Sequence, residues 1–147
     1  MKSLREFYKL VDEKLETKRF LKFCMVGLSG VGVNLGLLWI LTDHFGIYYL
    51  VSAVFSVETS ILTNFTLNEL WTFSDRVTNR STRPLLGRLT KFNLISAGGL
   101  VINITILWAF TEFLGFYYLI SALFGIAGAT LWNYFANASV TWKKSAS

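Results

Sequence analysis

The chain has little of what a soluble or disulfide-linked protein of its length usually contains. Its 147 residues include one proline, one cysteine and one histidine. A single cysteine excludes a disulfide framework within the chain, and a lone histidine without spaced partners predicts no metal site. Charge is also missing from long windows, among them 24–42, 92–111 and 113–142. The rest is rich in apolar residues, 53% of the chain, which indicates a membrane protein.

The apolar windows have the length of membrane-spanning helices. A bilayer core of about 30 Å needs about 20 helical residues, so we expect four spans, at roughly 22–42, 49–71, 92–112 and 118–140. Continuous apolar runs lack the alternation that a β-barrel requires. The predicted fold class is therefore an all-α integral membrane protein with four transmembrane helices. Little chain remains for a soluble catalytic domain, so we expect neither enzymatic activity nor a cofactor.

Basic residues are confined to three segments, and these predict the orientation. All fourteen Lys and Arg residues lie in 2–22, 76–91 and 143–144. By the positive-inside rule these segments, and with them both termini, are cytoplasmic. The net charge of +5 then indicates orientation and attraction to anionic lipids, and no binding of nucleic acid. We expect a multi-pass protein of the cell (plasma) membrane.

The N-terminal leader, residues 1–18, is predicted to be an amphipathic helix. Its apolar residues recur at helical spacing, with charged residues between them: Leu4, Phe7, Tyr8, Val11 and Leu15. Such a helix is expected to lie on the inner surface of the membrane. Docking onto a helix of a partner enzyme is the alternative.

The sequence contains a duplication with an offset of 69 residues. Between 19 and 73, 19 of 55 positions match the residue 69 places later. Each copy holds two helices, so both enter the membrane in the same direction and form parallel repeats. The predicted membrane domain covers 19–144, with repeat 1 at about 19–75, repeat 2 at about 88–144 and a basic cytoplasmic loop at 76–91. Four short helices leave a cramped path within one chain, so a homo-oligomer is an open alternative.

Small residues predict where helices approach closely. The first span has a GxxxG step at Gly32 and Gly36. Small residues also recur every four positions in two other spans. In the second span they are Ser52, Ser56 and Ser60, and in the fourth they are Ser121, Gly125 and Ala129. Packing is the predicted role of all of them.

Three polar residues are predicted to share a layer near the midplane of the membrane. Asn34, Asn103 and Glu58 each lie nine residues from the outer end of their span, about 13 Å at 1.5 Å per residue. The two asparagines either hydrogen-bond across the repeat axis or contact a ligand. Glu58 differs, because its counterpart in the second repeat is Ala127. A carboxylate at the bilayer centre costs about 2.5 kcal/mol or more and needs a partner, a wet cavity or a proton, so Glu58 is the leading functional candidate.

Two pairs of asparagines lie closer to the cytoplasmic side. The pairs are Asn64 with Asn68 and Asn133 with Asn137. Residues four apart share one face of a helix. Each pair is therefore predicted either to clamp two helices together or to contact a ligand.

A basic rim for phosphate is predicted at the cytoplasmic ends of the first and third spans. Its members are Arg19, Lys22, Arg88 and Lys91. Arginine pairs bidentately with phosphate oxygens, which is the physical basis of this prediction. Charge that serves only to orient the chain is the alternative.

Three motifs make the chain resemble the GtrA-like family. They are the entry Arg19, Phe20 and Gly27, the outer turn Gly46, Tyr48 and Tyr49, and the exit Asn64, Phe65, Asn68, Trp71, Thr72 and Phe73. The resemblance covers about residues 18–144, and the same module is the membrane part of some polyprenyl-phosphate mannose synthases. It implies flipping of polyprenyl-phosphate-linked sugars for cell-surface polysaccharide or glycolipid synthesis. The implied partners are the lipid-linked sugar, a membrane-associated glycosyltransferase and membrane lipids.

Two other functions remain open. A basic inner face and an amphipathic leader also fit a membrane anchor or recruitment subunit for the glycosyltransferase. A small proton-coupled antiporter is the third possibility, since such proteins carry a membrane carboxylate. Theirs lies in the first helix, whereas Glu58 lies in the second, and a parallel repeat is unexpected for them.

Overall fold

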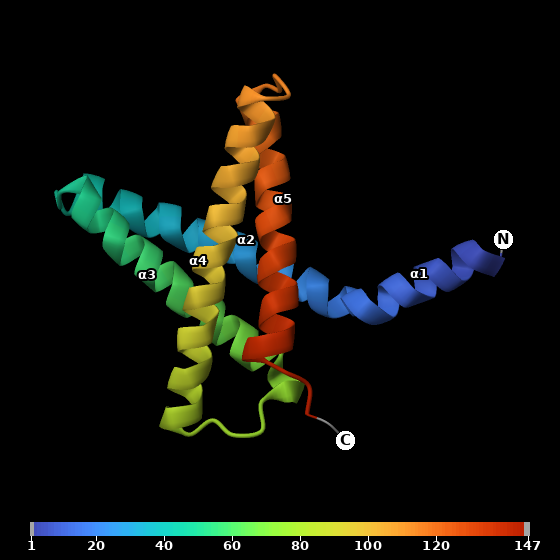
Figure 1. The fold of residues 1–147 in the computed structure, drawn as a ribbon. Helices are drawn as coiled ribbons and strands as arrows, with labels where there is room; N and C mark the ends of the chain where they lie inside the picture. The colour runs from blue at the N-terminus through green and yellow to red at the C-terminus, as the bar shows by residue number, and fades with distance from the viewer. Residues whose placement is uncertain (1, 146–147) are drawn as a thin grey trace. The chain divides into compact units, whose positions relative to one another are not determined.

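All secondary structure of the described residues is helical. The computed structural model describes the backbone of residues 2–145 and the side chains of 4–9, 13, 16–48, 51–52, 54–117 and 120–145. It divides into two units, Met1–Ser74 and Asp75–Ser147. The course of the chain through both is shown in Figure 1.

Unit 1 is a leader helix followed by a helical hairpin. Its elements are α1 (Lys2–Leu15), α2 (Thr17–Trp39), the π-helix η1 (Ile40–His44), α3 (Tyr49–Leu67) and the π-helix η2 (Asn68–Thr72). Both α3 and η2 contact α2, so the second helix runs back along the first (Figure 1).

Unit 2 is a second hairpin. The 3-10 helix η3 (Ser74–Arg76) leads into it, followed by α4 (Thr82–Glu112), α5 (Tyr118–Ala136) and the π-helix η4 (Asn137–Thr141). Helix α4 contacts both α5 and η4. The two helices of this hairpin lie side by side in Figure 1.

The duplicated sequence folds twice into the same hairpin. Helix α5 and η4 begin and end 69 residues after α3 and η2. The turns between the two helices of each hairpin contain Gly46 and Gly115, which share a φ of 66°. This left-handed conformation favours glycine because it has no Cβ. Backbone geometry therefore follows the repeat in the turn and in the second helix, whereas the π-helix η1 has no counterpart at the end of α4.

The connection between the hairpins is shorter than the sequence indicates. Residues 82–91, assigned above to a basic loop over 76–91, form the first turns of α4, and only 77–81 separate η3 from that helix. Pro84 lies in the first turn of α4, where a helix needs no backbone donor. The loop prediction is corrected accordingly.

The buried apolar residues of each hairpin occupy matching positions. They are Phe23, Val26, Phe65 and Phe73 in unit 1, and Phe92, Ile95, Tyr134 and Trp142 in unit 2. The rings of Phe23 and Phe73 lie 6.4 Å apart edge to face, and those of Phe92 and Trp142 lie 5.8 Å apart. Each hairpin is thus held at the end where its second helix finishes.

The small residues divide into two groups. Ser52, Ser56 and Ser121 are fully buried, which agrees with their predicted packing role. A Cβ added at Gly32 or Gly36 would meet no atom within 4 Å in the described structure, so these glycines do not bring α2 close to α3. The GxxxG prediction is wrong for this hairpin, and Gly30 makes the close approach in its place.

Two helical segments are long and apolar enough to cross a bilayer. They are Thr17–His44, with a mean hydropathy of 1.9, and Thr82–Glu112, with 1.8. Helices α3 and α5 are shorter, at 19 residues each, before their π-helical ends. The second and fourth spans stay predictions.

Helix α1 exposes three apolar residues of the predicted leader stripe. Leu4, Phe7 and Tyr8 are all more than half exposed. Val11 and Leu15, which continue the predicted stripe, lie outside the described side chains. The placement of this helix on the membrane surface stays a prediction.

Candidate functional site

The junction of α1 and α2 is built around Arg19. Glu16 has a positive φ of 42°, and its carboxylate pairs with the guanidinium of Arg19. The same guanidinium donates to the Thr72 carbonyl at 2.8 Å and lies 5.5 Å from the centre of the Phe73 ring. Arg19 therefore ties the start of α2 to the end of η2.

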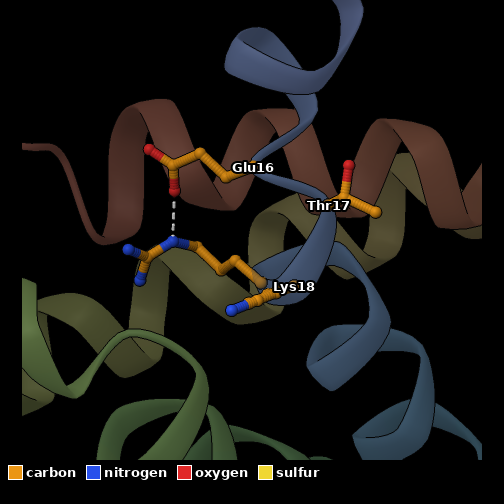
Figure 2. Close-up of a pocket in the computed structure, with 4 residues that line it drawn as sticks. Glu16, Thr17 and Lys18 are labelled. Atoms are coloured by element: carbon orange, nitrogen blue, oxygen red, sulfur yellow. Dashed lines mark hydrogen bonds and ion pairs between the residues drawn. The ribbon is translucent and has the colours of Figure 1, made fainter.

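A pocket of about 540 Å³ opens at this junction. It is lined by Glu16, Thr17, Lys18 and Arg19. Figure 2 shows the carboxylate of Glu16 paired across it with the guanidinium. Because that pair and the Thr72 carbonyl already engage Arg19, its predicted role in a phosphate rim competes with a structural one.

Lys22 lies one turn further along α2 and faces a different partner. Its ammonium is 5.3 Å from the centre of the Trp71 ring, within the range of a cation–π contact. Trp71 itself is 41% exposed. A cation and a partly exposed indole ring are thus placed together where η2 meets α2.

The corresponding end of unit 2 uses another arginine. Arg88, the counterpart of Arg19, donates to the Asn79 carbonyl at 3.0 Å. Arg76 donates to the carbonyls of Ala138 at 2.9 Å and Trp142 at 3.1 Å. The sequence places Arg76 only within the basic segment 76–91 and predicts no contact for it. Lys91, the fourth predicted rim residue, is exposed on α4.

The predicted asparagine pairs point into the hairpins. A Cβ added at Gly99 would lie 2.6 Å from Asn133 Oδ1, and Asn64 makes the equivalent contact over Gly30. Asn68 and Asn137 are 2% and 0% exposed. These positions support the helix-clamp alternative.

Hydrogen bonds fix the asparagines of unit 2 further. Asn137 donates to the Asn133 carbonyl at 2.7 Å and accepts from the Thr141 hydroxyl at 2.7 Å. In unit 1 the equivalent oxygens, Asn68 Oδ1 and Thr72 Oγ1, are buried and have no hydrogen bond to any described atom. The two clamps therefore share a position and differ in their bonding.

The predicted midplane residues have different surroundings. Asn34 and Asn103 are half-buried. The backbone carbonyl of Asn103 would lie 2.8 Å from a Cβ at Gly125, so α4 and α5 touch there. Glu58 is exposed on α3 and, among the described residues, makes no hydrogen bond or ion pair.

Glu58 belongs to a polar face of α3 that sequence reasoning described only in part. The exposed or half-buried residues of this face are Glu58, Thr59, Thr63 and Thr66, which we call the α3 polar face. Their counterparts on α5 are Ala127, Gly128, Trp132 and Phe135. One hairpin thus presents a carboxylate and three hydroxyls where the other presents only apolar and aromatic side chains.

Sequence reasoning also missed Glu69. This residue is 3% exposed, on the same π-helical segment as Asn68 and Thr72. Its counterpart in the second repeat is Ala138, so it shares with Glu58 the signal of a carboxylate that the duplication does not repeat. Among the described residues, no group of three His, Cys, Asp or Glu could hold a metal ion.

Comparison with known proteins gives the family. Residues 22–142 match the family described as "GtrA/DPMS, transmembrane domain". The chain belongs to this family. It is a membrane protein, and the matched part is a transmembrane domain.

A related protein carries the same domain within a longer chain. A dolichol-phosphate mannosyltransferase of Pyrococcus furiosus is 40% identical over 139 residues, which is 95% of this chain and 38% of the relative. This GtrA/DPMS chain therefore spans less than two fifths of that relative's length. The resemblance inferred from the three sequence motifs is confirmed.

Proposed function

We propose that this GtrA/DPMS protein translocates polyprenyl-phosphate-linked sugars across the cell membrane and is not itself an enzyme. The relative is a mannosyltransferase named for dolichol phosphate, which is a polyprenyl phosphate. Kinship with its membrane region supports a place in the metabolism of such lipids. The sugars would serve the synthesis of surface polysaccharide or glycolipid.

The observation that favours translocation is Glu58. An anchor has no need of a carboxylate on a membrane helix, and the bilayer interior disfavours one. Glu58 is exposed on its own hairpin and so available to a polar ligand. We assign the asparagines to the supporting scaffold. Lys22 of unit 1 and the exposed Lys91 of unit 2 are the remaining candidates for attracting phosphate.

The proposal includes four spans. Helix α3 with η2, and α5 with η4, each continue over 24 residues, from Tyr49 to Thr72 and from Tyr118 to Thr141. At 1.5 Å per residue this is about 36 Å, enough for a bilayer core. Each packs along a segment of spanning length and composition. Both termini would then be cytoplasmic.

A transport measurement tests the proposal. The purified protein is reconstituted in liposomes with dolichyl-phosphate mannose in one leaflet, and exposure of the sugar in the other leaflet is followed over time. We expect exposure at a rate above that of protein-free liposomes. Folded, correctly inserted protein that adds nothing to the protein-free rate would overturn translocation.

Substitution of Glu58 by Gln separates function from folding. A hydrogen bond to a charged group contributes about 1.5–3 kcal/mol, so its loss should slow transport about 10- to 100-fold. Thermal unfolding should change little, because Glu58 is exposed. Ala127→Ser at the matching position of α5 is the control. Asn34→Ala should lower both transport and stability, and equal loss of folded protein in Glu58→Gln and Asn34→Ala would mean that Glu58 is structural.

Anchoring of a glycosyltransferase is the second candidate, favoured by the exposed apolar residues of α1. Its test removes residues 1–15 and neutralises Arg80 and Arg83, which are exposed. Arg76 and Arg88 stay, because both hold backbone carbonyls. If a partner transferase remains membrane-bound and active, anchoring is not the function. Family membership gives no support to the antiporter alternative.

A further inference from the structure

We infer that the α3 polar face is the surface that contacts the sugar of the lipid, and that each chain carries one such surface. This inference rests on the proposed translocation and names the residues that carry the headgroup. It adds three threonines to Glu58 and excludes the equivalent face of α5.

Glu58 sets the requirement for a polar occupant. Its carboxylate is exposed and makes no hydrogen bond or ion pair with any side chain that the structure describes. A carboxylate can only accept hydrogen bonds when ionised, so its occupant must offer donors. Acyl chains offer none, whereas the hydroxyls of a hexose offer several.

Each threonine hydroxyl of this face donates its proton to a backbone carbonyl of α3, and its oxygen remains able to accept hydrogen bonds. Thr59 donates to the Phe55 carbonyl, Thr63 to the Thr59 carbonyl and Thr66 to the Leu62 carbonyl, each at 2.7 Å. A hydroxyl that has donated its proton keeps two acceptor lone pairs. The whole face therefore accepts hydrogen bonds, which complements the donors of sugar hydroxyls.

The inner end of the same hairpin suits the other parts of the headgroup. The Lys22 ammonium can pair with a phosphate, and the 41% exposed Trp71 ring offers an apolar surface to a sugar ring. From Trp71 to Glu58 the chain rises roughly 20 Å at 1.5 Å per residue, more than one hexose can bridge. The headgroup would therefore occupy two positions in succession. The first is at Lys22 and Trp71, and the second is at the α3 polar face.

The second hairpin supplies the contrast. Ala127, Gly128 and Phe135 replace Glu58, Thr59 and Thr66, and they offer no side-chain acceptor. Trp132 replaces Thr63, and its indole donates to the Ile95 carbonyl at 2.9 Å. This face suits acyl chains, so the two repeats cannot exchange roles.

Leu62 and Leu131 provide a matched pair for a crosslinking test. They are 69 positions apart and similarly exposed, at 48% and 43%. Leu62 lies one turn from both Glu58 and Thr66. A benzophenone amino acid is placed at either position of the full chain in liposomes containing radiolabelled dolichyl-phosphate mannose or radiolabelled dolichyl phosphate.

We expect adducts at Leu62 to favour the mannosylated lipid at least tenfold over the sugar-free lipid, and adducts at Leu131 to show no preference. Glu58→Gln, or the isosteric triple variant Thr59→Val, Thr63→Val and Thr66→Val, should reduce the preference at Leu62 at least fivefold. Folding of each variant is verified by thermal unfolding in detergent.

Equal labelling of Leu62 by both lipids would overturn the inference, and so would protein–protein adducts at Leu62, since a second copy would then cover this face. The outcome is separable from the transport assay. Sugar-dependent adducts without transport would support the contact and refute translocation. Transport together with sugar-independent adducts would agree with translocation and refute the contact between the α3 polar face and the sugar.

Discussion

The two hairpins share their interior and differ in what they present outward. Both place an asparagine over a glycine, have a left-handed glycine in the turn between their helices and end their second helix in a π-helix. The α3 polar face carries one carboxylate and three hydroxyls, while the matching face of α5 is apolar and aromatic. The interior therefore builds the hairpin, and the outward face of the second helix is where the copies acquired separate roles.

The largest expected effect comes from placing on α5 the carboxylate that α3 carries, which tests the difference between the two outward faces. Ala127→Glu should cost about 2.5–3.5 kcal/mol of membrane insertion, because the proposed lipid-facing position offers no partner. The measurement is the fraction of inserted, protease-protected chain, with Ala127→Gln as the uncharged control. Insertion equal to the parent would mean that this face of α5 does not face lipid.

The shared interior can be tested at the glycines beneath the asparagines. Gly30→Ala and Gly99→Ala should each lower the free energy of unfolding by about 1–3 kcal/mol, because the new Cβ overlaps an asparagine side chain. Gly32→Ala is the control, since open space surrounds that position. Unfolding in mixed micelles measures the change, and similar values at Gly30 and Gly32 would contradict the clamp.

The arginine caps are a smaller difference between the hairpins. Arg19→Ala and Arg76→Ala should each reduce the free energy of unfolding by about 1.5–3 kcal/mol. Each substitution removes hydrogen bonds from a charged donor. Arg88→Ala should have less effect, because Arg88 donates to the Asn79 carbonyl in the exposed connection. An Arg88→Ala loss larger than that of Arg76→Ala would reverse the assignment of the caps.

The smallest expected effect concerns Trp132. Trp132→Phe removes the indole donor to the Ile95 carbonyl and should cost about 0.5–1.5 kcal/mol. Thr63→Val at the matching position of α3 removes a hydroxyl that bonds only within its own helix, so we expect a smaller change. The same unfolding assay applies, and equal losses would show that the indole bond does not join α4 to α5.

The sequence was sufficient to predict the helical hairpins, because the offset of 69 and the apolar windows both depend on local pattern. It also identified Asn64, Asn68, Asn133 and Asn137 as a set. It could not distinguish clamp from ligand contact, since that depends on which face of each helix meets its neighbour.

The sequence did not predict the roles of Arg76, Glu69 and Gly30, and each omission has a physical reason. Arg76 caps unit 2 from outside the matched spans 19–73 and 88–142, so the repeat gave no signal for it. Glu69 lies beyond the charge-free window and looked like an ordinary end of a span. Gly30 carries the close approach, although the GxxxG spacing favoured Gly32 and Gly36, because spacing alone does not show which glycine faces α3.

The π-helical ends of α3 and α5 make the duplication visible in the backbone as well as in the sequence. π-turns are rare within helices. Yet η2 and η4 stand at the same offset of 69 residues as the rest of the repeat. Their shared position indicates that the hairpin had this end before it was duplicated. Glu58, Glu69 and Trp132, whose counterparts are Ala127, Ala138 and Thr63, then mark the divergence of the two halves.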